Sequence, residues 1–214
     1  MSVKSKVNNI FKVLKEKNPN PKTELEYSSV FTLLVAVVLS AQSTDKGVNA
    51  VTRKLFKEAN TPQKMVELGE KKIKKLISKI GLFNTKSKNV FLLSKILIEK
   101  FRGEVPSDRD SLVKLPGVGR KTANVVLNTF FNKPYIAVDT HLFRLGNRIG
   151  IAKGKTTLDV ENNYLKIIPK WAMKNAHHWL ILHGRYVCKA RNPLCNECGI
   201  SKFCEFFKKE KIYE

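Results

Sequence analysis

Helix-start and helix-stop signals recur along nearly the whole chain, and they constrain its fold more than any other feature. Candidate helices start at polar capping residues and stop at Gly, Pro or Asn. The alternation of apolar and polar residues that is typical of strands is almost absent. The sequence therefore predicts an all-α fold, with helices over 1–17, 28–41, 44–58, 62–68, 70–80, 86–101, 107–115, 120–131, 139–149, 158–168 and 172–187.

The apolar run over 30–41 is ambiguous, because its β-branched residues also suit a buried strand. Its length favours a helix that is apolar on all sides and therefore lies at the centre of the fold. A membrane span needs about 20 apolar residues, and this run is well short of that length. The sequence therefore predicts no transmembrane helix.

The N-terminal segment is rich in lysine but has neither an apolar export core nor a cleavage site of small residues. An organelle transit peptide is the alternative, but such peptides are rich in Arg, whereas this segment has no Arg and contains Glu16. We expect an ordinary amphipathic helix with an apolar face of Val7, Ile10, Phe11 and Leu14. The protein is therefore expected to be cytoplasmic rather than secreted.

The charge balance favours a polyanionic partner. Forty Lys and Arg residues stand against 18 Asp and Glu residues, a net charge of +22, which is far more than solubility asks of a domain. A membrane surface, an acidic protein or a merely solvated lysine-rich surface would fit the same composition, and nucleic acid is the partner that we favour. The sequence shows no heptad repeat and no large apolar stripe of the kind that oligomers bury, so we expect a monomer.

All four cysteines lie close to the C-terminus in a C-x6-C-x2-C-x5-C array of Cys188, Cys195, Cys198 and Cys204. Disulfides are disfavoured because the chain has no export signal. Four thiolates suit zinc, although common zinc sites pair two short C-x2-4-C motifs and this array contains one. A [4Fe–4S] cluster suits such a loop equally well, so both groups stay open on this chemistry. Either would fix Lys189 and Arg191 as cations suited to phosphate oxygens.

A turn with two glycines, LPGVGRKTA at 115–123, joins two of the expected helices. Glycine permits positive φ and close approach of another backbone, and the first amides of the next helix are unpaired at the positive end of its dipole. This is a phosphate cradle. The alternative is a structural turn in which Leu115 and Val118 pack inward, and the high positive charge favours the phosphate interpretation.

Two side chains near this turn are candidates for chemistry. Lys121 lies in the first helical turn, where the dipole disfavours a cation and so makes the neutral amine more available as a nucleophile; phosphate contact is its alternative role. Asp139 is expected to cap the helix over 139–149, and its carboxylate would also stabilise a cationic sugar. His177, His178 and His183 lack the spacing of a metal pair, so we expect them to pack in the core or beside the site.

Several collinear motifs together resemble the endonuclease III family of DNA repair glycosylases. They are LSAQSTD (39–45), IGLFN (80–84), LPGVGRKTANVVLN (115–128), VDTH (138–141), HHWLILHGR (177–185) and the cysteine array. The resemblance implies a helix-hairpin-helix glycosylase fold with two helical modules flanking a DNA-binding groove. One is a six-helix module over 23–134, and the other is an iron–sulfur module of 1–22 plus 135–214 with a [4Fe–4S] cluster on the four cysteines.

The resemblance also implies a function, namely removal of oxidised pyrimidines such as thymine glycol from damaged duplex DNA. Lys121 would attack C1′ and form a Schiff base, and β-elimination would then cut the strand at the abasic site, with Asp139 assisting. Gln42 and Leu82 would fill the space left by the extruded base. The residues expected to contact DNA are Gln42, Leu82, Leu115, Gly117, Val118, Gly119, Arg120, Thr122, His141, Lys189 and Arg191. A non-catalytic DNA-binding module and an iron–sulfur electron carrier are the alternative functions.

Overall fold

The computed structural model describes residues 2–210, and within that range it contains helices and no strand. The predicted all-α fold is therefore confirmed. The helices are α1 (Val3–Lys17), α2 (Val30–Leu39), α3 (Asp45–Glu58), α4 (Pro62–Leu68), α5 (Glu70–Leu76), α6 (Phe83–Phe101), α7 (Arg109–Leu112), α8 (Arg120–Thr129), α9 (Thr140–Ile149), α10 (Thr157–Ile167), α11 (Met173–Tyr186), η1 (Ser201–Phe203) and α12 (Glu205–Glu210). Residue 1 and residues 211–214, which the expected iron–sulfur module includes, lie outside the described residues. In the described part of the chain, no helix is long and apolar enough to cross a membrane.

The polar capping residues begin most helices as the sequence predicts. The side chains of Ser29, Thr44 and Thr61 each accept a hydrogen bond from an amide in the first turn of α2, α3 and α4. Each such cap contributes about 1 kcal/mol to helix stability.

Some predicted boundaries are wrong. The expected helix over 107–115 shrinks to α7, because Lys114 and Leu115 donate to carbonyls three residues back and so tighten into the following turn. Helix α6 begins earlier than expected, directly after Leu82, which takes a left-handed backbone and offers no polar cap. The helix expected over 70–80 ends at Leu76. Helix α12 was not predicted, since Cys204 before it is not a usual capping residue.

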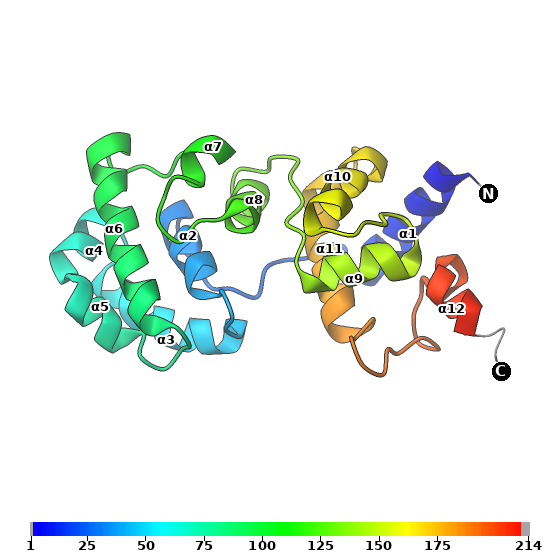
Figure 1. Cartoon of the computed structure of the whole chain (residues 1–214), viewed down its shortest axis with the longest axis horizontal. Helices are drawn as coiled ribbons and strands as arrows, with labels where there is room; N and C mark the ends of the chain where they lie inside the picture. The colour runs from blue at the N-terminus through cyan, green and yellow to red at the C-terminus, as the bar shows by residue number, and fades with distance from the viewer. Residues whose placement is uncertain (1, 211–214) are drawn as a thin grey trace. The chain divides into compact units, whose positions relative to one another are not determined.

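The chain folds as two compact units (Figure 1): unit 1 consists of Met1–Lys22 and Lys133–Glu214, and unit 2 consists of Thr23–Asn132. Unit 2 contains α2 to α8. These are seven helices where the resemblance implies six, and α7 is a single turn of 4 residues.

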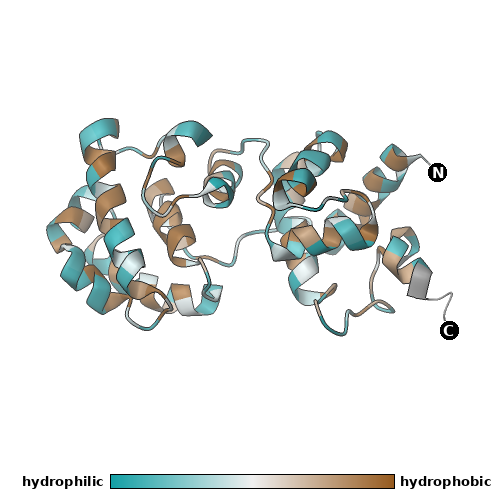
Figure 2. Cartoon of the chain, in the orientation of Figure 1, coloured by the Kyte–Doolittle hydropathy of each residue, from teal (hydrophilic) through white to brown (hydrophobic). Residues whose placement is uncertain are grey.

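Helix α2 forms the core of unit 2. Its residues from Phe31 to Leu39 are all buried, and α3, α6 and α8 pack around it. Figure 2 shows α2 as apolar over its length, in contrast to the mixed surface of α6. The prediction of a central, all-round apolar helix is therefore confirmed, and α8, which carries Lys121, rests directly on that core.

Helix α1 packs with the C-terminal half of the chain in unit 1. Its predicted apolar face, Val7, Ile10, Phe11 and Leu14, is buried as expected. This face packs in one cluster with residues of α9, α10 and α11, and Trp179 of α11 donates a hydrogen bond to the Asn18 carbonyl at 2.7 Å. The first helix therefore helps to position α9, the helix that Asp139 caps.

Candidate functional site

The glycine turn between α7 and α8 has the compact form of a hairpin. The Val118 amide donates to the Leu115 carbonyl at 3.0 Å, and Gly117 has a φ of 78°, which side chains other than glycine rarely adopt. A Cβ on Gly117 would lie 2.9 Å from Nδ2 of Asn89 on α6. The positive φ therefore requires glycine at this position, and the Asn89 side chain would also have to shift to admit a Cβ.

The two apolar residues of the hairpin point into unit 2. Leu115 is 2% exposed and Val118 is 5% exposed. Inward packing of these side chains, which the structural interpretation of the turn predicts, is thus observed. It leaves only their backbone groups available to DNA, so the hairpin combines a structural anchor with an accessible backbone.

Gly119 keeps the start of α8 open. Its φ of −88° is ordinary, it makes no side-chain cap, and a Cβ added to it would meet no atom within 4 Å. Conformation therefore does not require glycine here, whereas close approach of a ligand to the helix amides would. Arg120 and Lys121 are exposed beside it, and Thr122 is half-buried. Lys121 thus lies exposed in the first turn of α8, a helix whose start has no side-chain cap.

Gln42 and Leu82 occupy two adjoining turns of unit 2. Both have left-handed backbones, with φ values of 52° and 57°, a conformation that costs roughly 1–2 kcal/mol for a residue with a side chain. Leu82 is 54% exposed, and a Cβ on the preceding Gly81 would lie 3.8 Å from the Gln42 carbonyl oxygen. The fold therefore brings the turn that carries Gln42 next to the turn that carries the exposed Leu82.

Asp139 is the N-cap of α9, as predicted. Its Oδ1 accepts hydrogen bonds from the amides of His141 and Leu142, both at 2.9 Å. The side chain is half-buried, and the His141 ring lies 3.2 Å from a guanidinium nitrogen of Arg144. Because the cap uses one carboxylate oxygen, the other stays free for chemistry. Asp139 belongs to unit 1 and Lys121 to unit 2.

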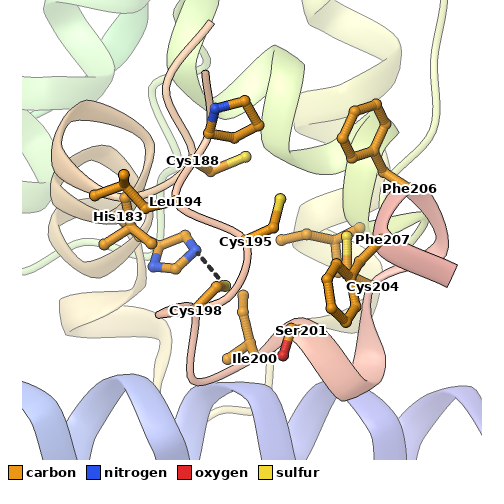
Figure 3. Close-up of a pocket in the computed structure, with 13 residues that line it drawn as sticks. His183, Cys188, Leu194, Cys195, Cys198, Ile200, Ser201, Cys204, Phe206 and Phe207 are labelled. Carbon is orange, nitrogen blue, oxygen red and sulfur yellow. Dashed lines mark hydrogen bonds between the residues drawn. The ribbon is translucent and has the colours of Figure 1, made fainter. Parts of the chain in front are cut away.

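The four cysteines gather around one apolar pocket of unit 1 (Figure 3). The pocket is also lined by His183, Leu194, Ile200 and Phe206. All four cysteines are half-buried free thiols, so the disulfide alternative is not what this fold forms. Burial raises the pKa of the Cys198 thiol, and the neighbouring Cys188, Cys204 and Cys195 raise it further, while a backbone hydrogen bond from Ile200 lowers it.

The four cysteines fit a metal centre that takes four thiolates. A tetrahedral zinc ion takes four sulfurs about 2.3 Å from one centre, and an iron–sulfur cube takes one thiolate on each of its four iron atoms. Four free cysteines that line one pocket offer the donor set of either group.

His183 lies beside the cysteines, with Nε2 3.6 Å from the Cys198 sulfur. Burial and the charge of Lys17 lower its pKa to about 4, so it is neutral at pH 7. His177 and His178 are also buried. The expectation that the histidines pack in the core or beside the site is confirmed.

Two arginines of α9 hold the loop after Cys188. Arg144 donates to the carbonyls of Gly184 and Cys188, and Arg148 donates to those of Lys189 and Ala190 at 2.7 and 3.0 Å. Because the loop is held through its backbone, the side chains of Lys189 and Arg191 remain exposed. Sequence reasoning missed Arg144 and Arg148; their i, i+4 spacing puts them on one helix face, but nothing local shows which loop they meet.

Two family models match the chain. The first, the HhH-GPD superfamily of base excision DNA repair proteins, matches residues 35–170. The second, the iron–sulfur binding domain of endonuclease III, matches residues 188–204, which begin and end at the outer cysteines of the array. The second match identifies the group that the four cysteines bind as an iron–sulfur centre.

Similar proteins cover almost the whole chain. Endonuclease III of Rickettsia conorii is 58% identical over 94% of this chain and 96% of its own length, and endonuclease III of Escherichia coli is 55% identical over 93% of each. A solved structure of a trapped endonuclease III–DNA covalent intermediate has a TM-score of 0.91 and 42% identity, and covers 99% of this chain and 100% of that one. A thermostable thymine-DNA glycosylase, 23% identical with a TM-score of 0.85 over 97% of each chain, shares the fold.

Proposed function

Because the chain belongs to the endonuclease III family of base-excision DNA repair proteins, we propose that it removes oxidised pyrimidines from duplex DNA and then cleaves the strand at the abasic site. Lys121 carries this proposal: its exposed amine lies in the first turn of α8, beside a hairpin built to accept a phosphate. A related endonuclease III has been trapped covalently on DNA, which supports a covalent route here.

The lysine amine begins the reaction. The lone pair of Lys121 Nζ forms a bond to C1′ of the damaged nucleoside, and the glycosidic bond breaks with its electron pair leaving on the base, which takes up a proton. The sugar ring opens to give a C1′=N Schiff base. Loss of a proton from C2′ then expels the 3′ phosphate by β-elimination, and water releases Lys121.

Asp139 assists at the sugar. Its carboxylate is held by the α9 amides, which fix its orientation, and the free oxygen stabilises positive charge on the sugar and relays protons. Gln42 and Leu82 enter the space vacated by the extruded base. An exposed leucine on a strained turn suits that role, since it meets an apolar surface only when DNA bases unstack around it.

The cysteine pocket holds a [4Fe–4S] cluster through Cys188, Cys195, Cys198 and Cys204. When bound, the cluster cross-links the loop over 188–204 and takes no part in base removal. The loop presents Lys189 and Arg191 to DNA phosphates. The high positive charge then serves non-specific grip on the duplex, so affinity should fall steeply with salt. The bacterial relatives support a cytoplasmic enzyme acting on the nucleoid.

Borohydride reduction during turnover tests the proposal. A thymine glycol duplex incubated with the protein and borohydride should yield a covalent adduct, and omitting borohydride should yield a cut strand. Binding to damaged duplex without an adduct or a cut would instead identify a non-catalytic DNA-binding module.

The two hairpin glycines should respond differently to alanine. Gly119→Ala should leave the melting temperature unchanged, because its Cβ meets nothing, but should weaken binding to a duplex with a tetrahydrofuran abasic analogue by about tenfold, because the phosphate can no longer approach. Gly117→Ala should also lower the stability, by roughly 1–2 kcal/mol, through its positive φ. Fluorescence anisotropy at fixed salt and thermal melting measure the two effects. Unchanged affinity of Gly119→Ala would contradict a phosphate at the hairpin.

Removing a cysteine should remove the cluster and loosen unit 1. Cys198→Ala should abolish the visible absorption of the iron–sulfur centre and lower the stability by at least about 2 kcal/mol, since metal binding contributes to folding. Ser201→Ala is the matched control, because Ser201 lines the same pocket without offering a sulfur. Absorption spectra and thermal melting give the comparison; full absorption in Cys198→Ala would overturn the ligand assignment.

A further inference from the structure

Lys86 on α6 is a buried lysine for which the reaction above has no use. Its side chain is 4% exposed, and its Nζ donates to the Ser43 hydroxyl at 2.8 Å. No carboxylate of the described residues pairs with it. Burial lowers the pKa of its amine. A buried cation with one neutral partner is costly, and an apolar side chain at this position would pack more cheaply.

The position of Lys86 between two turns gives it a role. Its backbone amide donates to the Leu82 carbonyl at 3.0 Å. This hydrogen bond forms the first turn of α6 and connects Lys86 to Leu82, the apolar residue proposed to enter the base stack. Its side chain reaches the other turn at Ser43, the residue next to Gln42. One residue therefore contacts the turn that presents Leu82 and the turn that presents Gln42.

The two turns have few other means of keeping their spacing. Gln42 and Leu82 have left-handed backbones, and within the described residues neither makes a side-chain hydrogen bond to the other turn. The Ser43 amide donates to the Ser40 carbonyl within its own turn. Gly81 lies close to the Gln42 carbonyl oxygen, which a Cβ on Gly81 would meet at 3.8 Å. The Lys86–Ser43 hydrogen bond therefore crosses the gap between the turns.

We propose that Lys86 is a positioning residue for opening the duplex: it fixes the spacing of the two turns, so that Gln42 and Leu82 enter the base stack together. The inference rests on the proposed function, which assigns the wedge role to Gln42 and Leu82. Lys86 itself does not touch the reacting sugar. Its loss should therefore slow extrusion of a stacked base more than it slows chemistry at a site that needs no extrusion.

Two substrates separate extrusion from chemistry. The first is a thymine glycol duplex, in which the damaged base must leave the stack, and the second is a single-stranded abasic oligonucleotide, in which no stack must be opened. Lys86→Met should lower the ratio of the single-turnover rates on these substrates, duplex over single strand, by about tenfold. A purely structural role would lower both rates together and leave the ratio unchanged.

Matched variants control for charge and for folding. Lys88→Met removes the same charge from an exposed position on the same helix and should keep the wild-type ratio. Ser43→Ala removes the acceptor with a minimal change of volume and should lower the ratio, whereas Ser43→Thr, which keeps a hydroxyl, should restore it. The Lys86→Met/Ser43→Ala double variant should be no worse than Lys86→Met alone, because both remove one interaction.

The outcomes distinguish this inference from the proposed function. If the wild-type protein neither releases the base nor forms an adduct, the proposed function fails and the inference fails with it. If the wild type is active and Lys86→Met gives the ratio of Lys88→Met, the inference alone is overturned. Should Lys86→Met not fold, the Ser43→Ala and Ser43→Thr pair decides: equal ratios in the two variants would reject the Lys86 contact as a positioning device.

Discussion

Lys121→Gln should reduce the borohydride-trapped adduct on a thymine glycol duplex to background, a loss on the order of 10³-fold or more. Glutamine is a shorter polar side chain without an amine, so no bond to C1′ can form. The variant should still bind the duplex, because Arg120, the hairpin amides and the other cations remain. Gel analysis of trapped adduct and of strand scission, beside anisotropy for binding, separates the two effects.

Lys114→Gln is the matched control for that experiment. Lys114 is an exposed lysine just before the same hairpin, so its replacement removes an equal charge from nearby. The Lys114→Gln variant should form the borohydride-trapped adduct at the wild-type level and lose only some affinity for the duplex at low salt. Trapping by Lys121→Gln at the level of Lys114→Gln would show that another amine is the nucleophile.

Asp139→Asn should lower the single-turnover rate of base release by about 10²–10³-fold while leaving the fold stable. Asparagine is as good an N-cap as aspartate, so the hydrogen bonds to the amides of His141 and Leu142 survive. The negative charge that stabilises the sugar cation is lost, and removal of one such electrostatic contact has an effect of this size. Rapid-quench measurement of base release and thermal melting give the two readouts.

Asp139→Ala separates the two roles of this carboxylate. It should lose the same activity and, in addition, about 1 kcal/mol of stability from the missing cap. A normal rate of base release in Asp139→Asn, together with a lower rate and lower stability in Asp139→Ala, would assign the residue a capping role only.

The sequence predicted the helices well wherever local signals decide them. Caps such as Ser29 and Thr44, and the uniformly apolar α2, depend on residues within a few positions of one another. The prediction failed at the start of α6, where left-handed Leu82 begins the helix without a polar side chain. There, packing of adjoining turns overrides the preference of leucine for a right-handed backbone, and no residue pattern predicts this.

The site divides in the same way. Residue types at short spacings predict the glycine hairpin proposed to bind phosphate, the candidate nucleophile Lys121 and the four candidate cysteine ligands. The choice between a cluster and one zinc ion does not follow from spacing, since both groups accept four cysteines. The family match over residues 188–204 decides it. The arginines that hold the cluster loop and the buried Lys86 are absent from the sequence prediction for a related reason: their partners lie about 40 residues away.

The sequence by itself determined the helical class, the glycine turn and the cysteine array, and it supplied the candidate residues for the chemistry, because each depends on near neighbours in the chain. Only the tertiary structure decided that Gly117 is required by its positive φ while Gly119 leaves space for a ligand. Only the tertiary structure brought Lys86 to Ser43 and α1 to the C-terminal helices. These features depend on burial and on contacts between distant segments, which arise when the apolar faces pack together.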